Sequence, residues 1–191
     1  KTIYIEADYL WGRKHKLSGW RNRIKDYSLT LGAGIHMVDL VMWLLKSKPT
    51  SVQAFGTKKG NIGSLFKKDS LIIYIFYFPN NIIVKLSANA VAIAEHFHEI
   101  KIFQTDRTLI NSISGAYSLI KKGNKTKMKK INAKYPDKKN RKKLIHNFLD
   151  CLVQPKKKHI IQNKDLFNLM SVCFAAEEAL KKNKKVKIRY I

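Results

Sequence analysis

The residues of this chain best suited to chemistry are a histidine and an aspartate that follow two glycines, Gly32 and Gly34. Glycine lets the backbone turn tightly and lets a ligand approach main-chain atoms. The apolar pattern after the glycines predicts a helix over residues 34–45, with His36 near its N-terminus and Asp39 one turn later. A helix N-terminus disfavours protonated imidazole, and neutral imidazole accepts protons. The segment predicts a general base, or alternatively a glycine turn before a core helix whose histidine has a structural partner.

A second group of candidates lies in the polar stretch 11–30, which has no sustained periodicity and is predicted to be a loop. Guanidinium and ammonium groups bind anionic oxygens, and an indole face stacks on a sugar ring. The same side chains can instead cap the end of a sheet. The stretch therefore predicts a site for an anionic or hydroxylated ligand, or a structural cap, formed by Arg13, Lys16, Trp20, Arg21 and Arg23.

Two further histidines, His96 and His98, alternate within an apolar segment, which places both imidazoles on one face of a strand. Such a pair could bind a metal, but the spacing indicates no third ligand. We therefore predict no metal site, and interpret the pair as surface or dimer-interface histidines. A serine hydrolase is not predicted either, because the sequence contains no nucleophile elbow.

Several short motifs, in their order along the chain, together resemble the Gfo/Idh/MocA family of NAD(P)-dependent oxidoreductases. Each motif is weak alone, and the shared order makes the resemblance specific. It covers nearly the whole chain but only half of a family member. The motifs are Glu6-Ala7-Asp8-Tyr9-Leu10-Trp11-Gly12-Arg13, Gly19-Trp20-Arg21, the glycine–His36–Asp39 segment, Val52-Gln53-Ala54-Phe55-Gly56, His96-Phe97-His98-Glu99-Ile100, Asn147-Phe148-Leu149-Asp150-Cys151-Leu152, Ala175-Ala176-Glu177-Glu178-Ala179-Leu180 and Val186-Lys187-Ile188-Arg189-Tyr190.

The resemblance implies a function and a division of roles. His36 would relay the proton of a substrate hydroxyl while a hydride passes between a sugar carbon and a nicotinamide. Asp39 would orient His36, or instead serve as a structural cap or ion-pair partner. Many relatives carry an aspartate at the position of Gly32, so the usual carboxylate contact is missing here. The substrate-binding residues implied are Arg13, Lys16, Trp20, Arg21, Gly32 and Gly34.

The expected cofactor is NAD or NADP, bound mainly by an N-terminal Rossmann domain that would precede Lys1. Within this chain, Gly32-x-Gly34 lacks the third glycine of a dinucleotide-binding fingerprint, since Met37 stands there. No cofactor-binding residue is therefore assigned. The expected substrate is a sugar, a sugar nucleotide or a similar polyol.

The remaining pattern predicts an α+β fold with an open, mainly antiparallel sheet and helices on one face, as in the dihydrodipicolinate-reductase-like C-terminal domain that the resemblance implies. Residues 1–191 are expected to form one domain. Strand 71–78 is apolar at both alternating positions, so both of its faces need cover. We predict that the face away from the helices forms a homodimer or tetramer interface through an outward position such as Ile73 or Tyr74. The predicted strands are 2–8, 51–57, 70–78, 81–89, 94–105, 108–113 and 186–190; the predicted helices are 34–45, 141–153 and 164–181; and 115–139 is predicted to be loop-like.

Composition narrows the classes of function. The chain has 38 Lys and Arg against 13 Asp and Glu, a formal charge of +25, which raises a polyanion-binding module as an alternative. The densest basic stretch, 121–143, lacks the interleaved aromatic residues of single-strand binders, so nucleic-acid binding is not predicted. A non-catalytic dimerisation domain is the other alternative. No apolar run is long enough to span a membrane, and the two cysteines are expected to be reduced core thiols of a cytoplasmic protein.

Overall fold

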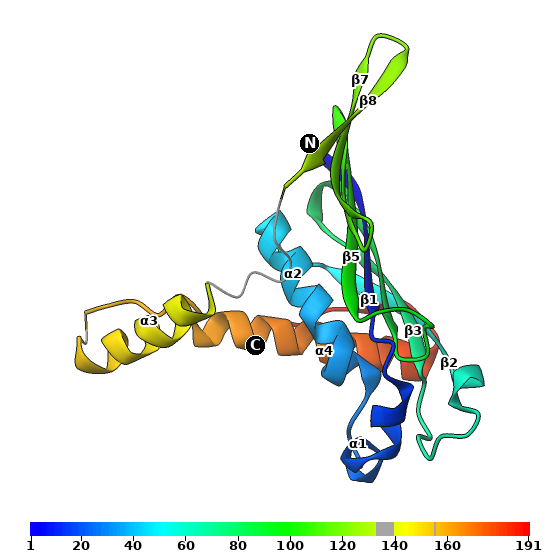
Figure 1. The fold of residues 1–191 in the computed structure, drawn as a ribbon. Helices are drawn as coiled ribbons and strands as arrows, with labels where there is room; N and C mark the ends of the chain where they lie inside the picture. The colour runs from blue at the N-terminus through cyan, green and yellow to red at the C-terminus, as the bar shows by residue number, and fades with distance from the viewer. Residues whose placement is uncertain (133–139, 155) are drawn as a thin grey trace.

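The fold is built on one nine-stranded sheet, seen in the computed structural model of residues 1–132, 140–154 and 156–191. The strand order is β8-β7-β6-β5-β1-β4-β3-β2-β9, and every neighbouring pair is antiparallel except β1 and β4 (Figure 1). This confirms the predicted α+β fold with an open, mainly antiparallel sheet. The strands are β1 (Thr2–Leu10), β2 (Ser51–Thr57), β3 (Leu71–Tyr77), β4 (Ile83–Asn89), β5 (Phe97–Gln104), β6 (Arg107–Ser112), β7 (Gly115–Lys122), β8 (Lys125–Ile131) and β9 (Val186–Lys187).

The first strand, β1, joins two meanders into a single sheet. Strands β2, β3 and β4 form one meander, and β5 to β8 form the other. β1 lies between them, parallel to β4 and antiparallel to β5. Its register places Tyr9 opposite Ala88 on one side and His98 on the other. The C-terminal end of β1 therefore lies beside the start of β5, although these segments are far apart in the sequence.

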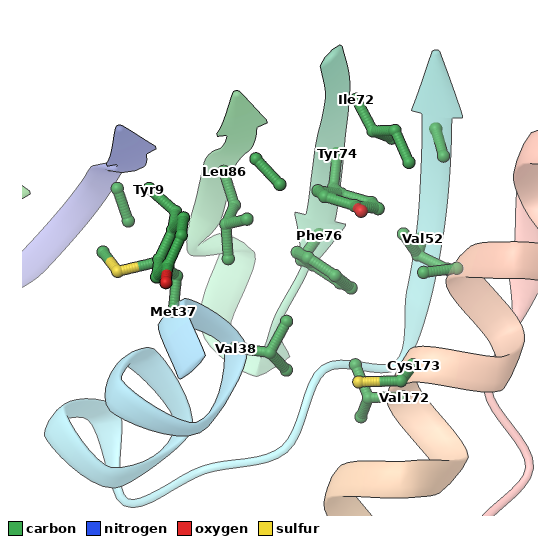
Figure 2. Close-up of a cluster of buried hydrophobic side chains, with 14 of the residues drawn as sticks. Tyr9, Met37, Val38, Val52, Ile72, Tyr74, Phe76, Leu86, Val172 and Cys173 are labelled. Atoms are coloured by element: carbon green, nitrogen blue, oxygen red, sulfur yellow. The ribbon is translucent and has the colours of Figure 1, made fainter. Parts of the chain in front are cut away.

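Two helices cover one face of the sheet. Helix α2 (Ile35–Leu45) contacts β1, and helix α4 (Asn163–Lys182) packs on β2. The alternation of β3 directs Ile72, Tyr74 and Phe76 into this layer, where they are buried with Met37, Val38, Val172 and Cys173 (Figure 2). Burial of these apolar side chains holds the helices against the sheet.

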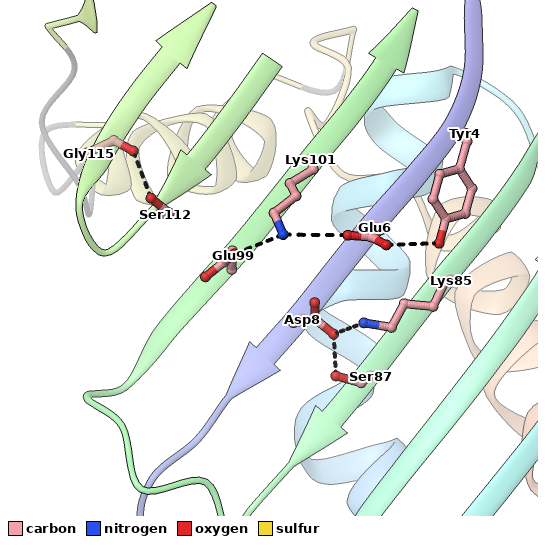
Figure 3. A network of polar contacts seen from close by, with 9 residues as sticks. All are labelled: Tyr4, Glu6, Asp8, Lys85, Ser87, Glu99, Lys101, Ser112 and Gly115. Atoms are coloured by element: carbon pink, nitrogen blue, oxygen red, sulfur yellow. Dashed lines mark hydrogen bonds and ion pairs between the residues drawn. The ribbon is translucent and has the colours of Figure 1, made fainter. Parts of the chain in front are cut away.

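The opposite face of the sheet is open in the single chain and carries a mixture of side chains. On β3, Ile73 points to this face and is half-buried, whereas Tyr74 is buried beneath the helices. The suggestion that Tyr74 could point outward is therefore wrong, because a residue and its neighbour in a strand occupy opposite faces. The sheet also carries ion pairs between neighbouring strands. Asp8 lies 2.6 Å from the Lys85 ammonium group, and the Lys101 ammonium group lies 3.6 Å from the Glu6 carboxylate (Figure 3).

Residues 115–131 depart from the sequence prediction. A loop was expected over 115–139, yet β7 and β8 form a hairpin that extends the sheet beyond β6. Strand β8 is rich in lysine and is exposed along its whole length. Its sequence therefore lacks the apolar alternation by which a strand is predicted. Main-chain pairing with β7 holds the strand. Residues 133–139 lie outside the described part of the chain.

The remaining helices lie away from the sheet or at its end. Helix α3 (Arg141–Val153) has the predicted bounds and projects from the body of the molecule, with its apolar face exposed (Figure 1). The stretch 11–30, predicted to be a loop, contains a short 3-10 helix (Lys14–Ser18) and helix α1 (Trp20–Arg23). The final strand is also shorter than predicted. Among the described residues, no helix combines the length and apolar character that crossing a membrane requires.

Candidate functional site

An open pocket of about 440 Å³ lies where the end of β1, the outer side of α2 and the start of β5 meet. Each of these elements presents side chains to it because β1 pairs with β5 and α2 packs over β1. Figure 2 shows Tyr9 reaching from β1 towards α2, beside Met37. The pocket is lined by Tyr9, His36, Met37, Asp39, Leu40, Trp43, His96 and His98.

Tyr9 is the centre of a cluster that contains three imidazoles. Its ring stacks on His36 with centroids 5.8 Å apart and planes inclined by 23°. The ring of His98 meets Tyr9 edge-on at 4.7 Å, and that of His96 does so at 5.3 Å. The Tyr9 hydroxyl forms a hydrogen bond of 3.0 Å with His96 Nε2. Tyr9 thus fixes the relative positions of groups that can donate or accept protons.

The protonation of His96 and His98 follows from their surroundings. Burial, with smaller contributions from the charges of the neighbouring His96 and His36, lowers the pKa of His98 to about 4. Burial also lowers the pKa of His96, with additional effects from Arg13, His36 and Lys16. Both imidazoles are therefore neutral at pH 7, so neither of them places an imidazolium charge beside His36.

The position of His36 differs from the prediction in one respect. A π-helical turn (Thr30–Gly34) runs directly into α2, so His36 lies well inside a continuous helix. The helix dipole acts mainly on the first turn, so the argument that it keeps His36 neutral does not apply. The imidazole is exposed and faces the pocket.

The two glycines are explained by packing. A Cβ atom on Gly32 would lie 2.1 Å from Tyr27 Oη, and one on Gly34 would lie 3.2 Å from Tyr74 Oη. Both glycines have a place inside the helical segment instead of forming a turn before it. Neither lines the pocket, so their predicted part in substrate binding stays a prediction.

Asp39 shares the pocket with His36, one helical turn further along α2. Its side chain reaches solvent, yet the protein around the carboxyl desolvates it and raises its pKa. The charge of His36 opposes that shift, and the carboxylate of Asp165 adds to it. Asp39 is therefore close enough to His36 for the two groups to influence each other electrostatically.

The basic and aromatic residues of stretch 11–30 lie beside the pocket and do not line it. Arg13 and Lys16 are near enough to lower the pKa of His96 through their charge. The Arg21 guanidinium lies 4.2 Å from the centroid of the Trp20 ring, and Trp20 is exposed. The structure thus brings the predicted loop residues to the same end of the molecule as His36.

Sequence reasoning did not assign to the site three pocket residues that carry a hydroxyl or imidazole group. Tyr9 was noted only within a motif, and His96 and His98 were interpreted as surface or interface residues. The alternating histidines were the available signal, but their partner became visible only through the pairing of β5 with β1. Among the described residues, no three His, Cys, Asp or Glu side chains are arranged to hold a metal ion.

Comparison with known proteins places this arrangement in a family. A sequence model described as the GFO/IDH/MocA C-terminal domain matches residues 1–110. The chain belongs to the Gfo/Idh/MocA family. No curated protein matches it in sequence.

Solved structures share the fold of this Gfo/Idh/MocA domain at low sequence identity. UDP-N-acetylglucosamine 3-dehydrogenase from Acidithiobacillus ferrooxidans is 16% identical, with a TM-score of 0.73 over 95% of this chain and 55% of its own. Levoglucosan dehydrogenase in complex with NADH and L-sorbose is 11% identical, with a TM-score of 0.78 over 100% of this chain and 59% of its own. Myo-inositol 2-dehydrogenase from Lactobacillus plantarum is 11% identical, with a TM-score of 0.71 over 99% of this chain and 57% of its own. The chain therefore spans little more than half the length of these proteins.

The described part of this Gfo/Idh/MocA domain does not fit the phosphates of a nicotinamide dinucleotide. Such phosphates need main-chain N–H groups at a glycine-rich turn that opens a helix. The glycines at 32 and 34 lie inside a helical segment, with tyrosine side chains against them.

Proposed function

We propose that this Gfo/Idh/MocA domain is the substrate-binding and catalytic half of an NAD(P)-dependent dehydrogenase. The substrate would be a sugar, a sugar nucleotide or a similar polyol. NAD or NADP would be bound mainly by a Rossmann domain preceding Lys1 in the complete enzyme, and would supply the hydride acceptor. The observation that carries the proposal is the exposed His36 imidazole, held in an open pocket against Tyr9.

The pocket's own residues would manage the proton. A neutral imidazole nitrogen can accept a proton, so His36 would accept the proton of the substrate hydroxyl as the hydride leaves the same carbon. The face of Tyr9 stacked against it, 5.8 Å between centroids, and the nearby Asp39 carboxylate would stabilise the resulting imidazolium. His96 and His98 are neutral at pH 7 and would not oppose that charge.

Residues of stretch 11–30 would bind the substrate. Trp20 would provide an exposed indole face, and Arg13, Lys16 and Arg21 would provide positive charge. The open face of the sheet, with Ile73 on it, would join a second copy in a homodimer or tetramer. The two cysteines, neither of which forms a disulfide, agree with the expected cytoplasmic location.

The test is steady-state kinetics of His36→Ala in the complete two-domain enzyme, with its true substrate. Loss of general-base assistance should lower kcat by roughly a hundredfold or more while the far-UV circular dichroism is unchanged. His146→Ala, an exposed histidine on α3, is the matched control and should retain normal kcat. Normal turnover by His36→Ala would refute the catalytic assignment and favour a non-catalytic dimerisation domain.

A further inference from the structure

Beside the pocket, the guanidinium group of Arg21 is enclosed by aromatic rings. Its Cζ atom lies 4.2 Å from the centroid of Trp20, 5.3 Å from that of Trp11 and 6.0 Å from that of Tyr27. Contact with aromatic faces attracts the cation and restricts its orientation, while the N–H edge of the fork stays available for oxygen ligands. Among the described residues, no carboxylate forms an ion pair with Arg21.

The hydroxyl group of Tyr27 next to this cage is buried and has no hydrogen-bond partner in the described part of the chain. A buried hydroxyl without a partner costs free energy, so native proteins usually supply water or a ligand to it. Burial raises the pKa of Tyr27, while the charge of the Arg21 guanidinium group and its close approach to the phenol oxygen oppose that shift. The hydroxyl is therefore protonated at neutral pH and able to donate.

The position of this pair relative to His36 suits the far end of a small substrate. Trp11 follows Tyr9 by two residues, and Gly32, against which Tyr27 packs, precedes His36 by four. The end of β1 and the start of the helical segment lie at the same end of the molecule (Figure 1). Trp11 and Gly32, which contact Arg21 and Tyr27, thus lie at the same end of the molecule as the stacked pair of Tyr9 and His36.

The surrounding charge is mostly positive: stretch 11–30 carries Arg13, Lys14, Lys16, Arg21, Arg23 and Lys25, against a single carboxylate, Asp26. Arg13 and Lys16 act on His96 from the same stretch of chain, and neither forms an ion pair in the described residues. A region with several cations and no paired carboxylate has a positive potential.

We propose that Arg21 and Tyr27 form an anion-binding subsite for a carboxylate or phosphate group of the substrate. The guanidinium fork would bind two oxygens of the anion, and the Tyr27 hydroxyl would donate to one of them. This inference rests on the proposed function, since it assumes that the substrate's reacting carbon lies at His36. It restricts the proposed sugars and polyols to those that carry an anionic group.

The experiment measures binding of inorganic phosphate and of acetate to the intact protein, with glycerol as the uncharged comparison. Trp11 and Trp20 flank the guanidinium, so their fluorescence reports on occupancy, and ionic strength is held constant with sodium chloride. We expect saturable binding of at least one anion. The anion that binds more tightly shows whether the subsite favours a phosphate or a carboxylate group. Arg21→Gln should weaken it at least tenfold, and Tyr27→Phe should weaken it several-fold.

Arg23→Gln is the matched control, because Arg23 is exposed on the same short helix and its replacement removes the same charge. It should bind the anion as the wild type does. Equal losses in Arg21→Gln and Arg23→Gln would overturn the proposal, and so would the absence of saturable binding by either anion. If Arg21→Gln fails to fold, Arg21→Lys keeps the charge without the fork and should still weaken binding. His36→Ala should leave anion binding intact, so failure of the catalytic assignment is distinguishable from failure of the subsite.

Discussion

The hydroxyl of Tyr27 lies in the space that a side chain at position 32 would need. A Cβ atom on Gly32 would be 2.1 Å from Tyr27 Oη and 2.4 Å from Cζ, far inside van der Waals contact. The two residues are therefore a matched pair: the tyrosine ring packs on the helical segment because its neighbour there has no side chain. The Tyr27 phenol thus occupies the space beside the position at which, by the resemblance, many relatives carry an aspartate.

The first prediction concerns this pair. Replacing glycine by alanine inside a helix normally stabilises a protein by about 0.5–1 kcal/mol. Gly32→Ala should instead destabilise this one, because displacing the Tyr27 ring from a packed site costs about 1–3 kcal/mol. Urea unfolding measures the change. In a Tyr27→Ala background the same substitution should become neutral or stabilising, and Gly19→Ala, which meets no close atom, should show no such dependence. Equal effects in both backgrounds would contradict the pairing.

Asp39 provides the second prediction. If it supports a proton-accepting His36, Asp39→Asn should lower kcat in the complete enzyme while leaving KM for the sugar nearly unchanged. The loss should be smaller than the hundredfold or greater loss expected for His36→Ala, since the base itself is retained. Asp106→Asn, whose carboxylate pairs with Arg107 on the exposed surface, is the control and should not alter kcat. A change in KM alone would assign Asp39 to substrate binding.

The low pKa of His98 predicts a specific pH dependence of stability. The folded state holds this imidazole neutral down to about pH 4, whereas the unfolded chain takes up a proton near pH 6.5. The unfolded state therefore binds more protons than the folded state between these pH values. The contribution of His98 to the free energy of unfolding is fully present above pH 6.5 and is lost as the pH falls towards 4. His98→Gln should reduce the acid-induced loss of unfolding free energy, measured in urea at several pH values. His146→Gln, on exposed α3, should leave it as in the wild type.

The fourth prediction concerns the open face of the sheet. If a second copy covers the half-buried Ile73, then Ile73→Lys should place an ammonium group in that interface and yield monomer or aggregate. Met128→Lys, at an exposed position on β8, is the control and should keep the assembly of the wild type. Sedimentation velocity at micromolar concentration gives the answer. A wild-type protein that sediments as a monomer would show that this face is not an oligomer interface.

The sequence by itself determined most of the elements. The apolar residues located β2 and β3 closely, β3 as a run that is apolar at both alternating positions, because one face of each strand is buried beneath the helices. Helical spacing gave the bounds of α3 even though its apolar face is exposed. The same local information failed for β8, which is exposed throughout and is held by main-chain pairing that side-chain polarity does not encode.

For the candidate site, the sequence supplied His36 and Asp39 and the basic loop, and only the tertiary structure supplied their neighbours. The register that sets Tyr9 opposite His98 depends on how a strand near the N-terminus pairs with one almost ninety residues later. No local periodicity carries that information, because periodicity reports which face is buried and not which strand lies alongside. The glycines show the same limit: spacing suggested a turn open to a ligand, whereas packing against Tyr27 and Tyr74 explains their identity. Contacts between distant segments follow from the burial of the whole core, and they decided what stands next to His36.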